Sequence, residues 1–104
     1  MIETLKQLLG FGPKVNYKEL MDNGAIIVDV RTKGEYQGGH IKGSVNIPLQ
    51  NLESNLSKIK KDKTVITCCA SGVRSASAKS ILKAKGFKEV HNGGGWMSLN
   101  NKIS

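Results

Sequence analysis

Two short runs of apolar and β-branched residues constrain the fold of this chain most strongly. Residues 25–30 (AIIVDV) and 64–68 (TVITC) are almost continuously apolar, which is typical of strands buried on both faces, as in a parallel sheet. Shorter strands are predicted at 44–47 and 89–92. Segments with helical spacing separate these strands, so the sequence predicts an α/β fold with a small parallel β-sheet flanked by helices on both faces.

Helices are predicted from apolar spacing and from capping residues. The spacing of apolar side chains indicates helices over residues 51–59 and 75–85. Asn or Thr followed three residues later by Glu favours a helix N-terminus, and this arrangement occurs at 16–19 and 32–35. We therefore expect two further short helices, at about 17–21 and from 32 to the glycines at 38–39, and one last helical turn from Trp96.

The length of 104 residues is enough for one domain and too short for two. Residues 1–14 are predicted as an extension with a short helix at 2–9, and residues 15–104 as the domain itself. The first ten residues lack the pattern of a secretory leader, and no apolar run approaches the length of a membrane span. The expectation is a cytoplasmic monomer that does not bind membranes.

The net charge of +8 is concentrated between residues 58 and 88, where nine basic residues stand against one acidic residue, Asp62. One interpretation is a positive field around the cysteine pair that attracts small anions and favours a thiolate. A solubilising lysine-rich surface is the favoured interpretation for the outer lysines. No basic stripe with interleaved aromatic residues and no nucleic-acid-binding motif is present, so we do not expect a nucleic-acid partner.

The two cysteines, Cys68 and Cys69, are neighbours. Adjacent cysteines rarely bind one tetrahedral ion together, so no metal is expected. Cys69 begins a segment between a predicted strand and a predicted helix, where successive N–H groups and the helix N-terminus can form a cradle for an anion. Gly72 permits a positive φ, and Arg74 carries a permanent charge. The pattern indicates a nucleophilic thiolate with a lowered pKa at the mouth of this cradle, rather than an inert cysteine at a strand end.

Three stretches of the sequence resemble the rhodanese family, and together they cover Val15 to Trp96. The first is Asp29-Val30-Arg31 through Glu35-Tyr36, followed by the stretch from Gly39-His40-Ile41 to Pro48. The second is Cys69-x-x-Gly72-x-Arg74-Ser75. The third is Gly86-Phe87-x-x-Val90, followed by Asn92 and Gly94-Gly95-Trp96. The order and spacing of all three carry the resemblance.

The resemblance implies a sulfurtransferase of the single-domain type. Cys69 would take a sulfane sulfur from a small anionic donor such as thiosulfate, carry it as a persulfide, and pass it to cyanide or a cellular thiol. A sulfur-relay protein is a further possible partner, and no cofactor is required. The residues expected to bind the substrate are those of the loop and the first turn of the helix: Ala70, Ser71, Gly72, Val73, Arg74 and Ser75.

Other polar residues are expected to support the site. Asp29 and Arg31 could contact the substrate, but an internal ion pair, or a brace to Glu35 or the His40 region, is favoured. A reaction of an already ionised thiol needs no base, so His40 is expected to be structural. The three glycines at 93–95 are expected to form a turn beside the loop.

Two alternatives remain open from the sequence. Counted from Cys68, the spacing Cys68-x5-Arg74 is that of a phosphatase or arsenate reductase, although Gly72 lies three residues after Cys69, and Cys68 continues the apolar run. The other alternative is a sulfur-relay or docking module without thiosulfate activity. Cys68 itself is expected to be a small buried side chain rather than a resolving thiol.

Overall fold

The computed structural model describes residues 14–104. The helix predicted at 2–9 lies outside these residues and stays a prediction. The elements follow in chain order as α2 (Tyr17–Asp22), β1 (Ile26–Asp29), α3 (Lys33–Gln37), β2 (Val45–Asn46), the 3-10 turns η1 (Leu49–Asn51) and η2 (Glu53–Lys58), β3 (Val65–Cys69), α4 (Val73–Ala84), β4 (Val90–Gly95) and α5 (Trp96–Ile103).

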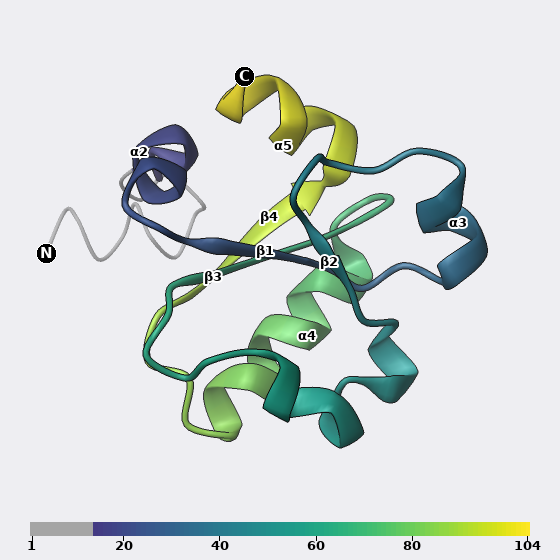
Figure 1. The fold of residues 1–104 in the computed structure, drawn as a ribbon, viewed down its shortest axis with the longest axis vertical. Helices are drawn as coiled ribbons and strands as arrows, with labels where there is room; N and C mark the ends of the chain where they lie inside the picture. The colour runs from purple at the N-terminus through teal and green to yellow at the C-terminus, as the bar shows by residue number, and fades with distance from the viewer. Residues whose placement is uncertain (1–13) are drawn as a thin grey trace, which may run out of the picture.

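The four strands form one parallel sheet in the order β2-β1-β3-β4 (Figure 1). The chain leaves β1 toward one side of the sheet and leaves β3 toward the other, so the strand order reverses between them. Ligand sites in open parallel sheets form at the carboxyl ends of the strands at such a point. Asp29 pairs with Cys68 in the β1–β3 register, which brings the ends of both strands to this position.

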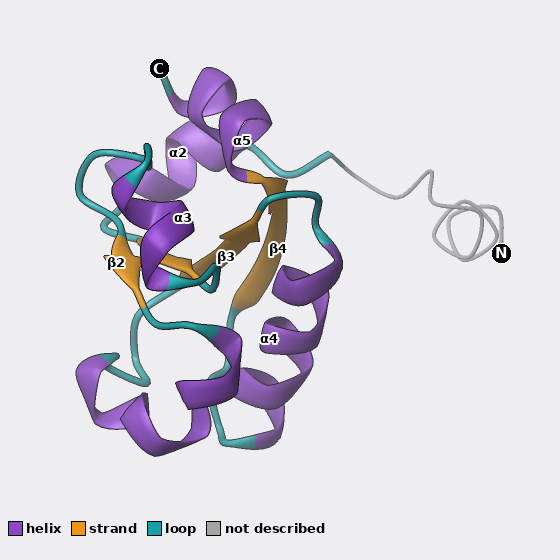
Figure 2. Cartoon of the chain, turned by 90° about the vertical axis from the view of Figure 1, so that its right-hand side faces the viewer, coloured by secondary structure: helices purple, strands orange, loops and turns teal. Residues whose placement is uncertain are grey.

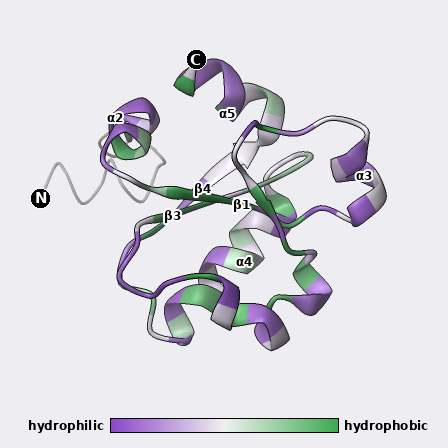
Figure 3. Ribbon diagram, viewed as in Figure 1, coloured by the Kyte–Doolittle hydropathy of each residue, from purple (hydrophilic) through white to green (hydrophobic). Residues whose placement is uncertain are grey.

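Helices cover both faces of the sheet (Figure 2). One apolar cluster contains Val65, Cys69 and Leu82 and joins the sheet to α4 and the 3-10 turns. The other contains Ile66, Cys68 and Leu99 and joins it to α2 and α5. The predicted α/β class with helices on both faces is therefore confirmed, and the interior strands are strongly hydrophobic, as Figure 3 shows for β1 and β3.

The helix predicted at 51–59 is wrong in type. Residues 49–58 form the two 3-10 turns η1 and η2 instead, and Asn55 interrupts the second with φ −125° and ψ 22°. The Asn55 amide donates to the carbonyl of Asn51 at 2.7 Å, and the Ser54 hydroxyl donates to the same carbonyl at 3.1 Å. Such side chains compete for backbone partners and disfavour a regular helix. The apolar spacing was still informative, because Leu52 and Ile59 are buried.

The C-terminal part of the chain is more regular than the sequence indicates. Strand β4 continues through the glycines to Gly95 instead of turning after Asn92, and α5 extends over eight residues rather than a single turn. The glycines allow close packing: a Cβ on Gly95 would stand 2.9 Å from the carbonyl oxygen of Ala70. The prediction that they lie beside the loop is thus confirmed, although they belong to a strand.

Replacing Gly93 by alanine is expected to destabilise the domain by about 1–3 kcal/mol, the usual cost of overpacking a core. The new Cβ would lie 2.8 Å from methyl groups of both Ile66 and Leu99. Urea denaturation measures the loss. Gly34→Ala is the matched control, because nothing lies within 4 Å of its Cβ position. Equal stability of the two variants would contradict this packing.

Within residues 14–104, none of the helices combines the length and the apolar character needed to traverse a bilayer.

Candidate active site

The connection from β3 to α4 is very short. The strand ends at Cys69 and the helix begins at Val73, which leaves a loop of Ala70, Ser71 and Gly72. Gly72 is the residue before the helix and has φ 102°, as the sequence predicts for a loop that curls onto a helix N-terminus. This backbone shape turns the free N–H groups of the first helical turn toward the end of β3.

The sulfur of Cys69 lies inside this curl. The Gly72 N–H donates to Sγ at 2.9 Å, and the N–H and hydroxyl of Ser75 both lie 3.4 Å from it. Burial alone would raise the pKa of this thiol, but hydrogen bonds from Ser75, Gly72 and Ser71 outweigh it and hold the pKa below its ordinary value. The loop therefore stabilises the thiolate, which is the nucleophilic form of cysteine.

The sequence suggests a thiol at the mouth of the cradle. In the structure, Cys69 is more enclosed than that. The residue is 0% exposed and belongs to the cluster beneath α4. A hollow of about 210 Å³ next to Arg74 is lined also by Thr32 and Pro48, and its lining does not include Cys69. Sγ is therefore covered in this structure.

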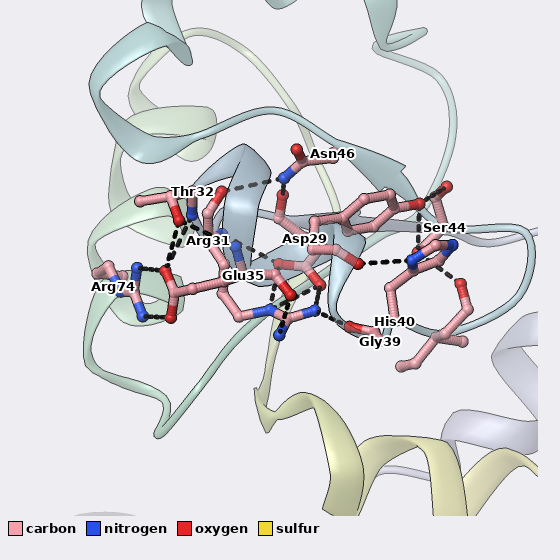
Figure 4. Close-up of polar contacts among 11 residues, drawn as sticks. Asp29, Arg31, Thr32, Glu35, Gly39, His40, Ser44, Asn46 and Arg74 are labelled. Atoms are coloured by element: carbon pink, nitrogen blue, oxygen red, sulfur yellow. Dashed lines mark hydrogen bonds and ion pairs between the residues drawn. The ribbon is translucent and has the colours of Figure 1, made fainter.

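The guanidinium of Arg74 faces the Glu35 carboxylate of α3 (Figure 4). Its two terminal nitrogens donate to the two carboxylate oxygens of Glu35 at 2.7 and 3.0 Å. Glu35 also completes the predicted capping box with Thr32. The hydrogen bonds from Arg74 and Thr32 lower the pKa of the Glu35 carboxyl to about 2, so this pair remains charged throughout the ordinary pH range.

Asp29 and Arg31 form a buried ion pair at the end of β1 (Figure 4). Two guanidinium nitrogens of Arg31 donate to the Asp29 carboxylate, the shortest contact being 2.8 Å. The same guanidinium donates to the carbonyls of Glu35 at 3.3 Å and Gly39 at 2.7 Å, and it lies 4.7 Å above the ring of Trp96. The pair thus ties the middle of α3 and the segment just beyond its C-terminus to the end of β1.

His40 lies beyond α3 and has no hydrogen bond to the loop. Its Nδ1 is 2.8 Å from the carbonyl of Tyr36, and its ring stacks on the Tyr36 ring at 3.8 Å between centroids. The Tyr36 hydroxyl donates to the carbonyl of Ser44 at 2.7 Å. These contacts join α3 to the segment before β2, so the position of His40 fits the expected structural role.

The sequence of residues 14–102 matches the family model of the rhodanese-like domain. This chain belongs to the rhodanese-like domain family. The loop at Cys69 is therefore the loop at the β3–α4 junction of a rhodanese-like domain.

Several proteins are similar to this rhodanese-like domain. The uncharacterized protein YqhL of Bacillus subtilis is 40% identical over 80 residues, which cover 76% of this chain and 64% of that protein. Thiosulfate sulfurtransferase PspE of Escherichia coli is 39% identical over 65% of this chain and 67% of its own length. The human single-domain sulfurtransferase TSTD1 superposes with a TM-score of 0.72 at 27% identity, over 83% of this chain and 90% of that one. The chain thus spans about two thirds of the two bacterial relatives.

Asn92 is a residue of the site to which the sequence assigns no role. Its Oδ1 accepts from the Ser75 hydroxyl at 2.6 Å and from the N–H of Gly94 at 2.9 Å, and its Nδ2 donates to the carbonyl of Gly72 at 3.2 Å. One side chain therefore joins β4, the loop and α4. The position of Asn92 at the end of a predicted strand, beside the glycines, was the signal available in the sequence.

Cys68 lies on the opposite face of the sheet from Cys69. It is buried with Ile66 and Leu99, as expected for a small apolar side chain. Burial, followed by the charge of Asp29, raises the pKa of the Cys68 thiol to about 12, so it stays protonated. Within residues 14–104 no three potential metal-ligating side chains come together.

The basic residues between 58 and 88 are mostly distant from the loop. Seven of them precede β3 or lie between the last turn of α4 and β4, at the amino ends of the strands, whereas Cys69 is at a carboxyl end. Lys61, Lys63 and Lys88 line one hollow there. The interpretation of this charge as a positive field around Cys69 is therefore wrong for most of it, and the favoured interpretation, a solubilising basic surface, fits the outer lysines.

The Cys69 thiol is expected to ionise at a lower pH than an ordinary cysteine, whose pKa is about 8.5, because the folded loop stabilises its thiolate. Ultraviolet absorbance of the thiolate follows the titration, and Cys68→Ser leaves Cys69 as the chain's one cysteine. The same variant unfolded in denaturant is the control and should titrate normally. A folded-state pKa at or above the unfolded one would contradict the hydrogen-bond assignment.

Proposed function

We propose that this chain is a sulfurtransferase that carries a sulfane sulfur on Cys69. The observation that supports this most strongly is the pair of backbone donors around Sγ: the Gly72 N–H at 2.9 Å and the Ser75 N–H at 3.4 Å. Donors fixed in this way stabilise negative charge on sulfur without reorganisation during the reaction. The similarity to thiosulfate sulfurtransferase PspE supports the same reaction class.

The proposed reaction has two steps. The Cys69 thiolate attacks the outer sulfur of thiosulfate, the sulfur–sulfur bond of the donor breaks, and its electron pair leaves with sulfite. An acceptor nucleophile, cyanide or a thiolate, then attacks the outer sulfur of the persulfide, and Cys69 leaves as a thiolate. A covalent intermediate of this kind predicts ping-pong kinetics. Free thiols stay reduced in a reducing compartment, so the proposal includes a cytoplasmic setting, with a cellular thiol or a sulfur-relay protein as the acceptor.

The other predicted site residues take supporting positions in this proposal. Residues 70–75 form the curl that holds the transferred sulfur. Asp29 and Arg31 fix α3, which carries Glu35, and Glu35 in turn holds Arg74 at the edge of the loop. The alternative of a phosphatase or arsenate reductase, which takes Cys68 as the nucleophile and counts the loop from Cys68 to Arg74, is disfavoured. Cys68 faces α5 rather than the curl.

Glu35→Gln is expected to lower the KM for thiosulfate by roughly two- to fivefold, the scale of one exposed ion pair. The substitution removes the carboxylate that holds Arg74 at 2.7 Å and leaves the arginine charge available to an anionic donor. Arg74→Ala should instead raise the KM. Steady-state kinetics at constant ionic strength measure both effects, and a higher KM for Glu35→Gln would mean that the pair itself is required.

The decisive experiment for the proposed function is an assay with thiosulfate and cyanide combined with intact-mass measurement. Thiosulfate alone should add the mass of one sulfur atom, and cyanide should remove it with formation of thiocyanate. A chain that gains no mass and makes no thiocyanate would overturn the proposal of a thiosulfate donor. Transfer from a protein persulfide under the same conditions would then identify a sulfur-relay module.

A further inference from the structure

The Ser75 hydroxyl stands between two acceptors. Its oxygen is 2.6 Å from Oδ1 of Asn92 and 3.4 Å from Sγ of Cys69. A serine hydroxyl has one hydrogen to donate, so it cannot donate to both at once. Ser75 is 0% exposed, so bulk solvent does not reach its hydroxyl. The direction of this single hydrogen depends on the state of the sulfur.

The orientation of Asn92 is determined by its other contacts. Its Nδ2 donates to the carbonyl of Gly72, which requires the amide nitrogen on that side and places Oδ1 toward Ser75. The N–H of Gly94 donates to the same Oδ1 at 2.9 Å, and the Tyr17 hydroxyl donates to the Asn92 carbonyl at 3.0 Å. Asn92 is thus a fixed acceptor, while the Ser75 hydroxyl hydrogen is free to turn.

The three states of Cys69 make different demands on this hydrogen. A thiol donates its own proton to the Ser75 oxygen, and Ser75 then donates to Asn92. A thiolate has no proton and is a strong acceptor for the hydroxyl hydrogen. In a persulfide the negative charge is on the outer sulfur, so Sγ becomes a weak acceptor again and Asn92 is preferred.

We propose that Asn92 is a positioning residue that competes with Cys69 for the hydroxyl hydrogen of Ser75 and releases it to Sγ when sulfur leaves. This inference rests on the proposed function. During discharge the acceptor anion attacks the outer sulfur, the sulfur–sulfur bond breaks, and its electron pair stays on Sγ. The hydroxyl then turns from Asn92 to Sγ and stabilises the leaving thiolate by a hydrogen bond. Ser75 keeps its proton throughout.

One substitution near the loop should lower the pKa of Cys69 rather than raise it. Asn92→Ala removes the competing acceptor, so the Ser75 hydroxyl donates fully to the thiolate, and the pKa of Cys69 falls. A residue that only holds the loop in place would have the opposite effect, because a loosened loop loses N–H donors and the pKa rises. Ser75→Ala removes the donor and raises the pKa, and in that background Asn92→Ala should no longer lower it.

Asn92→Asp provides a second variant in case the alanine variant does not fold. Its carboxylate has nearly the same shape and is a stronger acceptor for the Ser75 hydroxyl, although, like alanine, it loses the Nδ2 that donates to the Gly72 carbonyl. The pKa of Cys69 should rise in both backgrounds because of the added charge, and it should rise more when Ser75 is present. The other charged groups near the loop form two ion pairs, Asp29 with Arg31 and Glu35 with Arg74. Neither pair is changed in any of the variants.

The experiment combines thiolate titration with single-turnover discharge, using Cys68→Ser as the common background. We expect Asn92→Ala to lower the pKa only when Ser75 is present, and Ser75→Ala to slow release of sulfur to cyanide by roughly ten- to a hundredfold. A raised or unchanged pKa in folded Asn92→Ala, or the same fall without Ser75, would overturn the proposal. Titration requires no sulfur transfer, so a protein that fails to take up sulfur would refute the proposed function separately.

Discussion

Cys69→Ser is expected to abolish sulfur transfer completely, with no mass gain from thiosulfate and no thiocyanate formed. A serine hydroxyl is not ionised near neutral pH, and the loop contacts at Gly72 and Ser75 provide no base to ionise it. The loss should therefore be one of kcat rather than of KM, because the covalent intermediate cannot form. Intact mass and turnover measure the two consequences independently.

Cys68→Ser is the matched control for this prediction, since it changes the neighbouring cysteine on the other face of the sheet. It should keep the mass gain and most of the activity, although its buried position can reduce stability. Loss of the mass gain in Cys68→Ser, with retention in Cys69→Ser, would reverse the assignment of the nucleophile. It would also favour the alternative count of the loop from Cys68 to Arg74.

Arg31→Ala is expected to reduce the free energy of unfolding by about 3–5 kcal/mol, the usual cost of breaking a buried ion pair from one side. Asp29 is 0% exposed and Arg31 is 4% exposed, so the remaining carboxylate would stay buried without its counter-charge. The two carbonyls that Arg31 contacts, at Glu35 and Gly39, would also lose their donor. Urea denaturation measures the change when it is followed by the fluorescence of Trp96, whose ring lies against Arg31.

Two further variants separate this effect from a general loss of a basic side chain. Lys33→Ala removes an exposed cation nearby and should change stability little. The double variant Asp29→Ala with Arg31→Ala should lose less than the sum of the two single variants, because neither charge is left alone. A loss of less than 1 kcal/mol in Arg31→Ala would show that the pair contributes little to the fold.

The parts of the site that follow from local rules could be predicted from the sequence. The capping box of Thr32 and Glu35 and the positive φ of Gly72 depend on a few neighbouring residues. The apolar runs of β1 and β3 likewise identify buried parallel strands. The place of Cys69 between a strand and a helix then follows from the order of these elements along the chain.

Features that depend on contacts between distant segments could not be predicted in this way. Asn92 reaches Ser75 across 17 positions of the chain, and Arg74 reaches Glu35 across 39. The full burial of Cys69 depends on packing beneath α4. The length of α5 depends on Leu99 finding a buried place against the sheet, which a short segment with many polar residues does not indicate by itself.

The two cysteines are adjacent in sequence but face opposite sides of one sheet, which has a consequence for any sulfur that Cys69 carries. The chain contains no third cysteine, and the thiol of Cys68 stays protonated among apolar side chains. The loaded protein would therefore contain no second thiolate able to attack its own persulfide. A sulfur atom bound to Cys69 would leave only when an outside nucleophile arrives, so the lifetime of the loaded form would report the concentration of acceptors around it.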